Sequence, residues 1–98
     1  MDVTKYPIDG KTIQEEDWTG YLVQAKKEWL NKNEPQLPYV VIEDRGPRVL
    51  IQLLPEYQEK HYPNLSFPSI ESGYKEWYEV IDKDFLNTEE AKKAGFTK

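Results

Sequence analysis

Residues 39–54 read YVVIEDRGPRVLIQLL and decide the fold. Two apolar runs, 39–42 and 49–54, are rich in residues that favour strands, and turn-forming residues lie between them. This order predicts an antiparallel hairpin over 39–54. The turn lacks the Asn-Gly pair that is typical of a two-residue loop, so we expect a longer connection around Gly46 and Pro47. Because both runs are almost continuously apolar, we expect burial on both faces of the hairpin, or an interface on the second face.

The segment that precedes the hairpin predicts a long N-terminal helix. Residues 12–15, TIQE, have the form of a capping box. Apolar residues then recur with helical spacing at Trp18, Tyr21, Leu22, Ala25 and Trp29. We interpret this stripe as the face that packs on the core. Gly20 interrupts it and is expected to permit the close approach of another backbone. The helix should end by Asn33, because the prolines at 35 and 38 cannot continue it.

The segment that follows the hairpin has weaker signals. Its prolines, serines and glycine predict mostly loop from Glu56 to Gly73, with one helical turn at 56–60. Residues 74–81, YKEWYEVI, fit both a helical and a strand period, and their aromatic and β-branched content favours a strand. Residues 87–90, NTEE, are a second capping signature. With Gly95 as a left-handed cap, they predict a short C-terminal helix.

Together these elements predict an α+β fold with one long N-terminal helix packed on a small antiparallel sheet. The sheet would consist of the hairpin 39–54 and the strand 74–81, and the short C-terminal helix would complete the fold. A chain of 98 residues is expected to form a single domain, 1–98.

The composition argues against most kinds of catalysis. The chain has no cysteine and one histidine, His61, so it lacks the usual ligands of zinc and the usual groups for acid–base work at neutral pH. We therefore expect a protein that is not an enzyme and that needs neither a metal nor a cofactor. A small enzyme based on carboxylates alone stays open as an alternative, because the 18 acidic residues offer many pairs and nothing selects one of them.

The net charge of the chain indicates which class of partner it can bind. With 18 acidic against 13 basic residues the net charge is −5, which argues against binding to nucleic acid or to an anionic membrane and favours a protein partner with a basic surface. The first residues contain no apolar stretch typical of a signal peptide. We expect a cytoplasmic protein.

Aromatic and arginine side chains are the candidate contact residues. The chain has seven tyrosines and three tryptophans, the residue types that anchor protein interfaces, although many of them could instead belong to the core. We predict that a partner binds to Arg45 and Arg48 at the hairpin tip and to Tyr57 and Tyr62 in the proline-bounded loop. The alternative for the tip is a solvated turn in which the arginines pair with neighbouring acids.

These observations predict a small non-catalytic protein-binding domain. It would act as an inhibitor or adaptor on a macromolecular partner, of the kind that phages and mobile elements encode. An accessory subunit of an enzyme complex is the alternative from another class.

Overall fold

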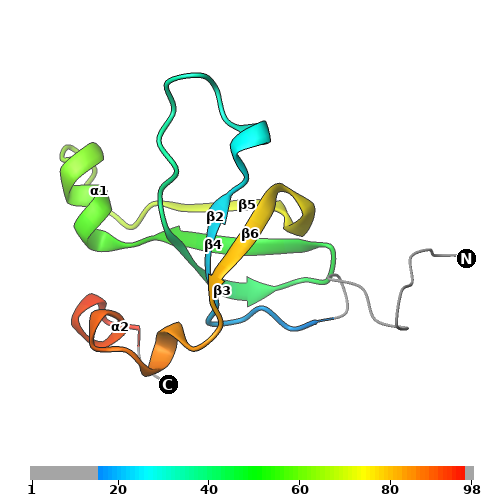
Figure 1. Ribbon diagram of the computed structural model, residues 1–98. Helices are drawn as coiled ribbons and strands as arrows, with labels where there is room; N and C mark the ends of the chain where they lie inside the picture. Colours follow the sequence, from blue (N-terminus) through cyan, green and yellow to red (C-terminus); the bar gives the residue numbers. More distant parts are fainter. Residues whose placement is uncertain (1–15, 97–98) are drawn as a thin grey trace, which may run out of the picture.

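The structure is a computed structural model that describes residues 16–96. Within this range five strands form one antiparallel sheet in the order β5-β4-β3-β2-β6 (Figure 1). The strands are β2 (Leu22–Ala25), β3 (Tyr39–Asp44), β4 (Arg48–Leu53), β5 (Ile70–Tyr74) and β6 (Tyr78–Asp82). The helical elements of the same range are α1 (Pro55–His61), α2 (Glu89–Ala94) and the 3-10 turns η1 (Lys27–Trp29), η2 (Lys75–Trp77) and η3 (Phe85–Asn87).

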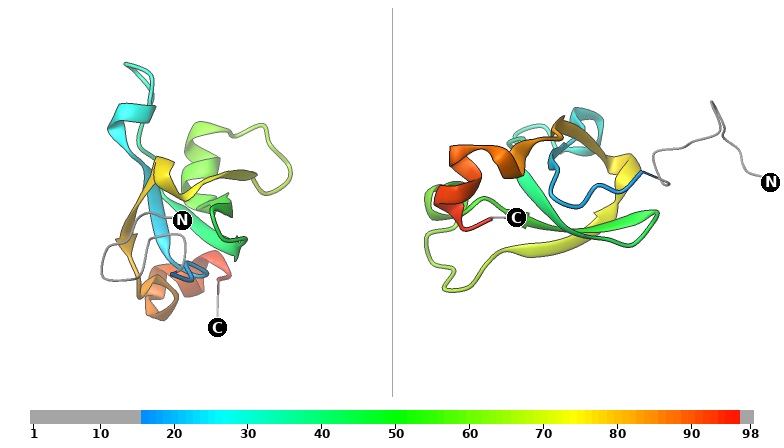
Figure 2. Two further views of the ribbon diagram at one scale, coloured as in Figure 1. Left: turned by 90° about the vertical axis from the view of Figure 1, so that its right-hand side faces the viewer. Right: turned by 90° about the horizontal axis from the view of Figure 1, so that it is seen from below.

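The sheet is strongly coiled. In Figure 1, β4 and β5 run across the view, whereas β2 and β6 run up it, and Figure 2 shows the same coiling from two other sides. The two edge strands, β5 and β6, are consecutive in the chain and are joined by η2. The start of α1 lies beside α2, since residues of both helices line one small hollow. None of the helices in the described range is long and apolar enough to cross a bilayer.

The predicted long N-terminal helix is wrong. Residues 22–25 form β2, which pairs with β3 on one side and with β6 on the other. The capping box at 12–15 lies outside the described residues. Gly20 has a φ of 90°, which a right-handed helix does not allow, and its amide donates to the Val41 carbonyl at 2.8 Å. The close approach predicted at Gly20 therefore exists, but it belongs to a turn that leads into a strand.

The apolar stripe of that segment has a different explanation. Trp18 and Val23 are buried in the main core, and Tyr21 and Ala25 pack against it, while Leu22 packs against a second core. Alternate residues of a strand point to opposite faces, so a strand buried on both faces carries apolar residues at spacings that also suit a helix.

The hairpin predicted over 39–54 is present as β3 and β4. The strand ends are separated by residues 45–47, but the Arg45 amide donates to the Arg48 carbonyl at 2.9 Å, so only Gly46 and Pro47 lie inside the hydrogen-bonded loop, which is shorter than expected. The Asp44 side chain accepts from the Gly46 amide at 2.8 Å. Gly46 has a φ of 89°. Burial on both faces holds for β3 alone, because Val40 and Val41 enter different cores. In β4 the buried residues alternate with less buried ones.

A β-bulge re-aims the end of β3. Val41 pairs with Ile51 and Glu43 with Leu50, so one extra residue lies in β3 between these pairs. Without the bulge, Val41 and Asp44 would point to opposite faces. With it, both face the main core, where Asp44 meets polar partners.

The strand predicted at 74–81 divides into three elements. Tyr74 ends β5, residues 75–77 form η2, and β6 begins at Tyr78. The sheet accordingly has two strands where the sequence predicted one. The turn is held in place because the Lys75 amide donates to the Pro47 carbonyl at 2.9 Å and the Lys75 side chain is drawn into the core.

The predicted C-terminal helix is confirmed as α2. The Thr88 hydroxyl accepts from the Ala91 amide at 3.1 Å, and Gly95 adopts the left-handed conformation with a φ of 91°. Ala91 of α2 packs with Phe85 and Leu54 in the second core. The helical turn predicted at 56–60 is also present and extends to the seven residues of α1.

Candidate functional site

The hairpin tip holds two of the four predicted contact residues. Arg45 pairs with Glu43, with 2.8 Å between Nε and Oε2, and both side chains are exposed. This is the solvated pair that the alternative interpretation expects. Arg48, in contrast, lies over an aromatic ring: its guanidinium carbon is 5.0 Å from the centroid of the Tyr74 ring.

The two predicted tyrosines differ in their surroundings. Tyr57 is half-buried and packs against the second core. Tyr62, at the C-terminal end of α1, is 46% exposed and lines two hollows of the surface. Binding by the tip and by these tyrosines stays a prediction.

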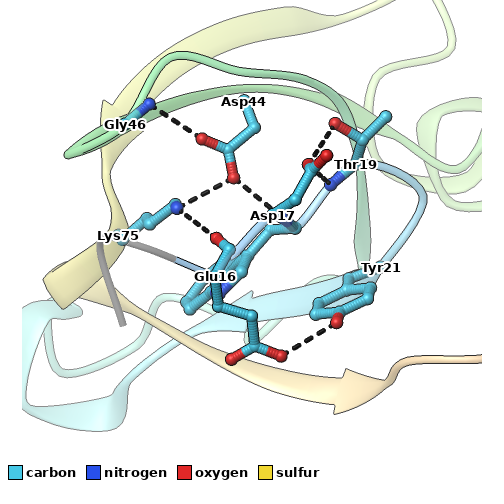
Figure 3. Close-up of polar contacts among 8 residues, drawn as sticks. Glu16, Asp17, Thr19, Tyr21, Asp44, Gly46 and Lys75 are labelled. Atoms are coloured by element: carbon cyan, nitrogen blue, oxygen red, sulfur yellow. Dashed lines mark hydrogen bonds and ion pairs between the residues drawn. The ribbon is translucent and has the colours of Figure 1, made fainter. Parts of the chain in front are cut away.

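A buried ion pair lies behind the hairpin tip (Figure 3). The Lys75 ammonium is 2.8 Å from Asp44 Oδ2 and donates to the Glu16 carbonyl at 2.7 Å. It also lies 5.4 Å from the centroid of the Trp18 ring. The same Asp44 oxygen accepts from the Trp18 amide at 2.7 Å, and the other accepts from the Gly46 amide. The pair thus ties η2 to the tip of the hairpin and to the segment before β2.

The electrostatics of this pair favour a structural role. Burial disfavours the Asp44 carboxylate, but hydrogen bonds from Lys75 and from two backbone amides outweigh burial and hold the pKa of Asp44 below its ordinary value of 3.8. The carboxylate is thus charged at neutral pH, and both of its oxygens already accept hydrogen bonds. The Lys75 side chain is only 1% exposed. We conclude that the pair stabilises the fold and offers no reactive group to a ligand.

A concave surface rich in aromatic residues lies on another side of η2. A cavity of about 390 Å³ is formed by residues of the loop between β2 and β3, the start of β3, the end of α1, β5, η2 and β6. Five aromatic residues and two glutamates stand out in its lining: Trp29, Tyr39, Tyr62, Trp77, Tyr78, Glu34 and Glu71. We call this cavity the aromatic pocket.

Two 3-10 turns bring tryptophans to the aromatic pocket. η1 supplies Trp29, which is 52% exposed, and η2 supplies Trp77. The Lys26 amide donates to the Trp77 carbonyl at 2.9 Å, so the turns are joined through their backbones. The two indole rings lie 6.2 Å apart at 44°, and Tyr74 packs edge-on against Trp77 at 5.0 Å. Trp29, Trp77 and Tyr74 form an aromatic row that ends beneath Arg48.

The glutamates give the aromatic pocket a negative charge. Burial raises the pKa of Tyr39 well above its ordinary value, and the nearby Glu71 carboxylate raises it further. Burial, followed by the charge of Glu71, raises the pKa of Tyr78 to about 12. Both phenols are therefore neutral at physiological pH. The lining residues include no lysine or arginine within the part of the chain that the structure describes.

A second hollow, of about 480 Å³, lies between α1 and the loop that follows it. Gln58 holds this loop, because its side chain donates to the Phe67 carbonyl at 2.8 Å and accepts from the Ser69 amide at 2.9 Å. Phe67 is 63% exposed beside it. Tyr62 contributes to the lining of both hollows.

The single histidine lies outside both hollows. His61 is exposed at the end of α1, and no group of three potential metal ligands occurs among residues 16–96.

The sequence interpretation included Tyr62 but missed Trp29, Trp77 and Glu71 as pocket residues. One signal points to the tryptophans: the triplet Lys-Glu-Trp occurs at 27–29 and again at 75–77, and both copies form 3-10 turns. Nothing local shows that the two turns meet, since 48 positions separate them, from 29 to 77.

Comparison of the chain with models of protein families, with curated proteins and with solved structures found no match, so the function is argued from the site itself.

Proposed function

We propose that this protein is a small, non-catalytic binding domain that docks on another protein through the aromatic pocket. The observation that carries the proposal is the pocket itself, a cavity of about 390 Å³ with two tryptophans and three tyrosines in its wall. Binding sites are typically concave and mostly apolar, with a few polar groups that fix orientation. The two glutamates and the two neutral phenols are such groups here.

The energetics of the exposed rings support this role. Trp29 and Tyr62 expose about half of their surface, and covering such rings removes a large apolar area from water. Tryptophan and tyrosine also lose little conformational entropy on binding, and hot-spot residues are enriched in both. The hydrogen bond that joins η1 to η2 holds the two tryptophans in place before a partner arrives, which lowers the cost of binding.

An inhibitor or adaptor is the role that such a surface serves best. The aromatic pocket and the second hollow share Tyr62 in their linings, and two hollows that share a residue suit a macromolecular partner better than a small ligand alone. The net charge of −5 favours a basic partner, and a cytoplasmic location accords with the absence of cysteine.

The experiment is affinity capture followed by measurement with a purified partner. The tagged protein is used to capture partners from a lysate of the organism that encodes it, and the partner is then purified. We expect Trp29→Ala and Tyr62→Ala to weaken binding by about 2 kcal/mol or more each, as interface hot spots do. Ile81→Ala is the matched control, because Ile81 is an exposed apolar residue of β6 outside the pocket.

The same assay tests the hairpin tip through Arg45→Ala and Arg48→Ala. If the Trp29 and Tyr62 variants bind the purified partner as tightly as the parent does, the pocket is not the docking site. A loss confined to the two arginine variants would assign docking to the tip instead.

A further inference from the structure

We propose that the group of the partner protein that enters the aromatic pocket is an arginine side chain. This inference rests on the proposed function and names the chemistry that the pocket recognises. It follows from three features of the pocket: its aromatic faces, its two glutamates and its size.

The aromatic faces attract a cation. A guanidinium placed within about 6 Å of a ring centroid is stabilised by the negative face of the ring, most strongly with tryptophan. Trp29 and Trp77 are inclined at 44° to each other, so the rings are not stacked face to face. The protein already uses this interaction at the next ring of the row, where Arg48 lies over Tyr74 at 5.0 Å. An arginine in the pocket would repeat the same contact on Trp29 and Trp77.

The glutamates supply the counter-charge. Glu71 lies close enough to Tyr39 and Tyr78 to raise the pKa of both phenols. It interacts with the Tyr39 hydroxyl, and a carboxylate has about four acceptor positions, so most of them stay available. Glu34 accepts only the Asn31 amide at 3.1 Å among the contacts of the described residues. Neither glutamate forms an ion pair with a lysine or arginine of that part of the chain.

Arginine fits these features better than lysine does. Its guanidinium is planar, more weakly hydrated than an ammonium, and able both to stack on a ring and to bind a carboxylate through two hydrogen bonds. A lysine ammonium would lose more hydration in an aromatic cavity and could not form the bidentate contact. A volume of about 390 Å³ also leaves room for the long stem of the side chain, which packs well on apolar walls.

The test is a titration of the labelled protein with short peptides, followed by NMR of the indole N–H groups. The peptides are Ac-Gly-Gly-Arg-Gly-Gly-NH2 and its matched control, in which citrulline replaces arginine and removes the charge while keeping the shape. Two further peptides carry lysine and trimethyllysine. Trp29 and Trp77 report on the pocket, and Trp18, which is 3% exposed in the core, serves as the internal reference.

We expect the arginine peptide to shift the Trp29 and Trp77 signals in the millimolar range while the Trp18 signal stays in place. The citrulline peptide should bind at least about fivefold more weakly. Glu71→Gln should weaken binding of the arginine peptide by about fivefold, because glutamine keeps an oxygen acceptor beside Tyr39 but removes the negative charge. Glu89→Gln on α2, outside the pocket, is the matched control and should leave the affinity for the arginine peptide unchanged.

The contrary outcomes are distinct. Equal binding of the citrulline peptide would refute recognition of charge, and tighter binding of the lysine or trimethyllysine peptide would refute arginine as the occupant. If none of the peptides shifts Trp29 or Trp77, the inference fails. The proposed function would then be judged separately. If the Trp29→Ala variant no longer binds the purified partner, docking at the pocket is supported whatever group enters it.

Discussion

Asp44→Ala should be among the most destabilising single substitutions in this chain. The change removes the carboxylate that pairs with the Lys75 ammonium at 2.8 Å and that accepts hydrogen bonds from two backbone amides. Lys75 cannot turn to solvent without leaving the core, because its side chain is 1% exposed, and the Asp44 side chain is itself only 10% exposed. The substitution therefore leaves a buried charge without its counter-ion.

The magnitude follows from this burial. Breaking a buried ion pair by removing one partner costs about 3–5 kcal/mol, since the remaining charge stays desolvated. The Glu16 carbonyl and the Trp18 ring continue to stabilise the ammonium, which argues for the lower half of this range. The free energy of unfolding of a domain is only about 5–15 kcal/mol, so this loss is a large share of the total stability.

Urea unfolding followed by tryptophan fluorescence measures the effect. Glu43→Ala is the matched control: it removes the neighbouring carboxylate, whose ion pair with Arg45 is exposed, and should leave the free energy of unfolding close to that of the parent. The double variant Asp44→Ala/Lys75→Met should recover much of the loss, because an apolar chain then replaces the stranded charge. If Asp44→Ala is no more destabilising than Glu43→Ala, the ion pair does not hold η2 to the hairpin.

The contribution of the Asp44 carboxylate also depends on pH in a defined direction. Its pKa is lower in the folded protein than the ordinary value of 3.8, so the folded state favours the charged form. The resulting stabilisation is complete above the unfolded value and is lost as the pH falls through the lower folded-state pKa. The difference in unfolding free energy between the parent and Asp44→Asn should therefore shrink on acidification below pH 3.8. A difference that grows in acid would contradict the sign of the shift.

Four further substitutions test the packing and the cap of α2. Trp18→Ala should cost about 3–5 kcal/mol because Trp18 is in the core, whereas Trp29→Ala should cost about 1 kcal/mol, and equal losses in urea unfolding would contradict the exposure of Trp29. Gly73→Ala should cost about 1–3 kcal/mol, because an added Cβ would lie 2.6 Å from the Tyr78 hydroxyl, and Tyr78→Phe in the same background should relieve part of the loss. Thr88→Ala should cost about 1 kcal/mol by removing the cap of α2, with Thr88→Ser as the control that keeps it; equal stability of the alanine and serine variants would show that the cap is dispensable.

Elements with strong local signals could be predicted from the sequence. The hairpin at 39–54 has two β-branched runs around a turn, and α2 has a capping threonine at one end and a glycine at the other. The argument against most catalytic and metal-binding functions, which rests on the absence of cysteine and the single histidine, stays a prediction. The hairpin and the helix depend on strand propensity, turn residues and helix caps. These effects act between residues a few positions apart, so they can be recognised in the sequence.

The identity of residues 22–25 was decided only by the tertiary structure. Their apolar spacing satisfies a helix as well as a strand that is buried on both faces, so local propensity does not choose between them. β2 forms because its backbone pairs with β3 and with β6, and β6 lies more than 50 positions away along the chain, as the pairing of Val23 with Val80 shows. Pairing across such a distance overrides a preference of a few tenths of a kcal/mol per residue.

The aromatic pocket depends on the same kind of long-range contact. Each tryptophan triplet is visible in the sequence, but the cavity exists because β2 and β6 pair and bring η1 against η2. The prediction that Trp29 packs on the core was wrong for this reason, since the turn that carries it projects from the sheet and leaves the indole half exposed. The sequence alone determined which residue types are available for contact, and the pairing of strands far apart in the chain decided which of them meet at one surface.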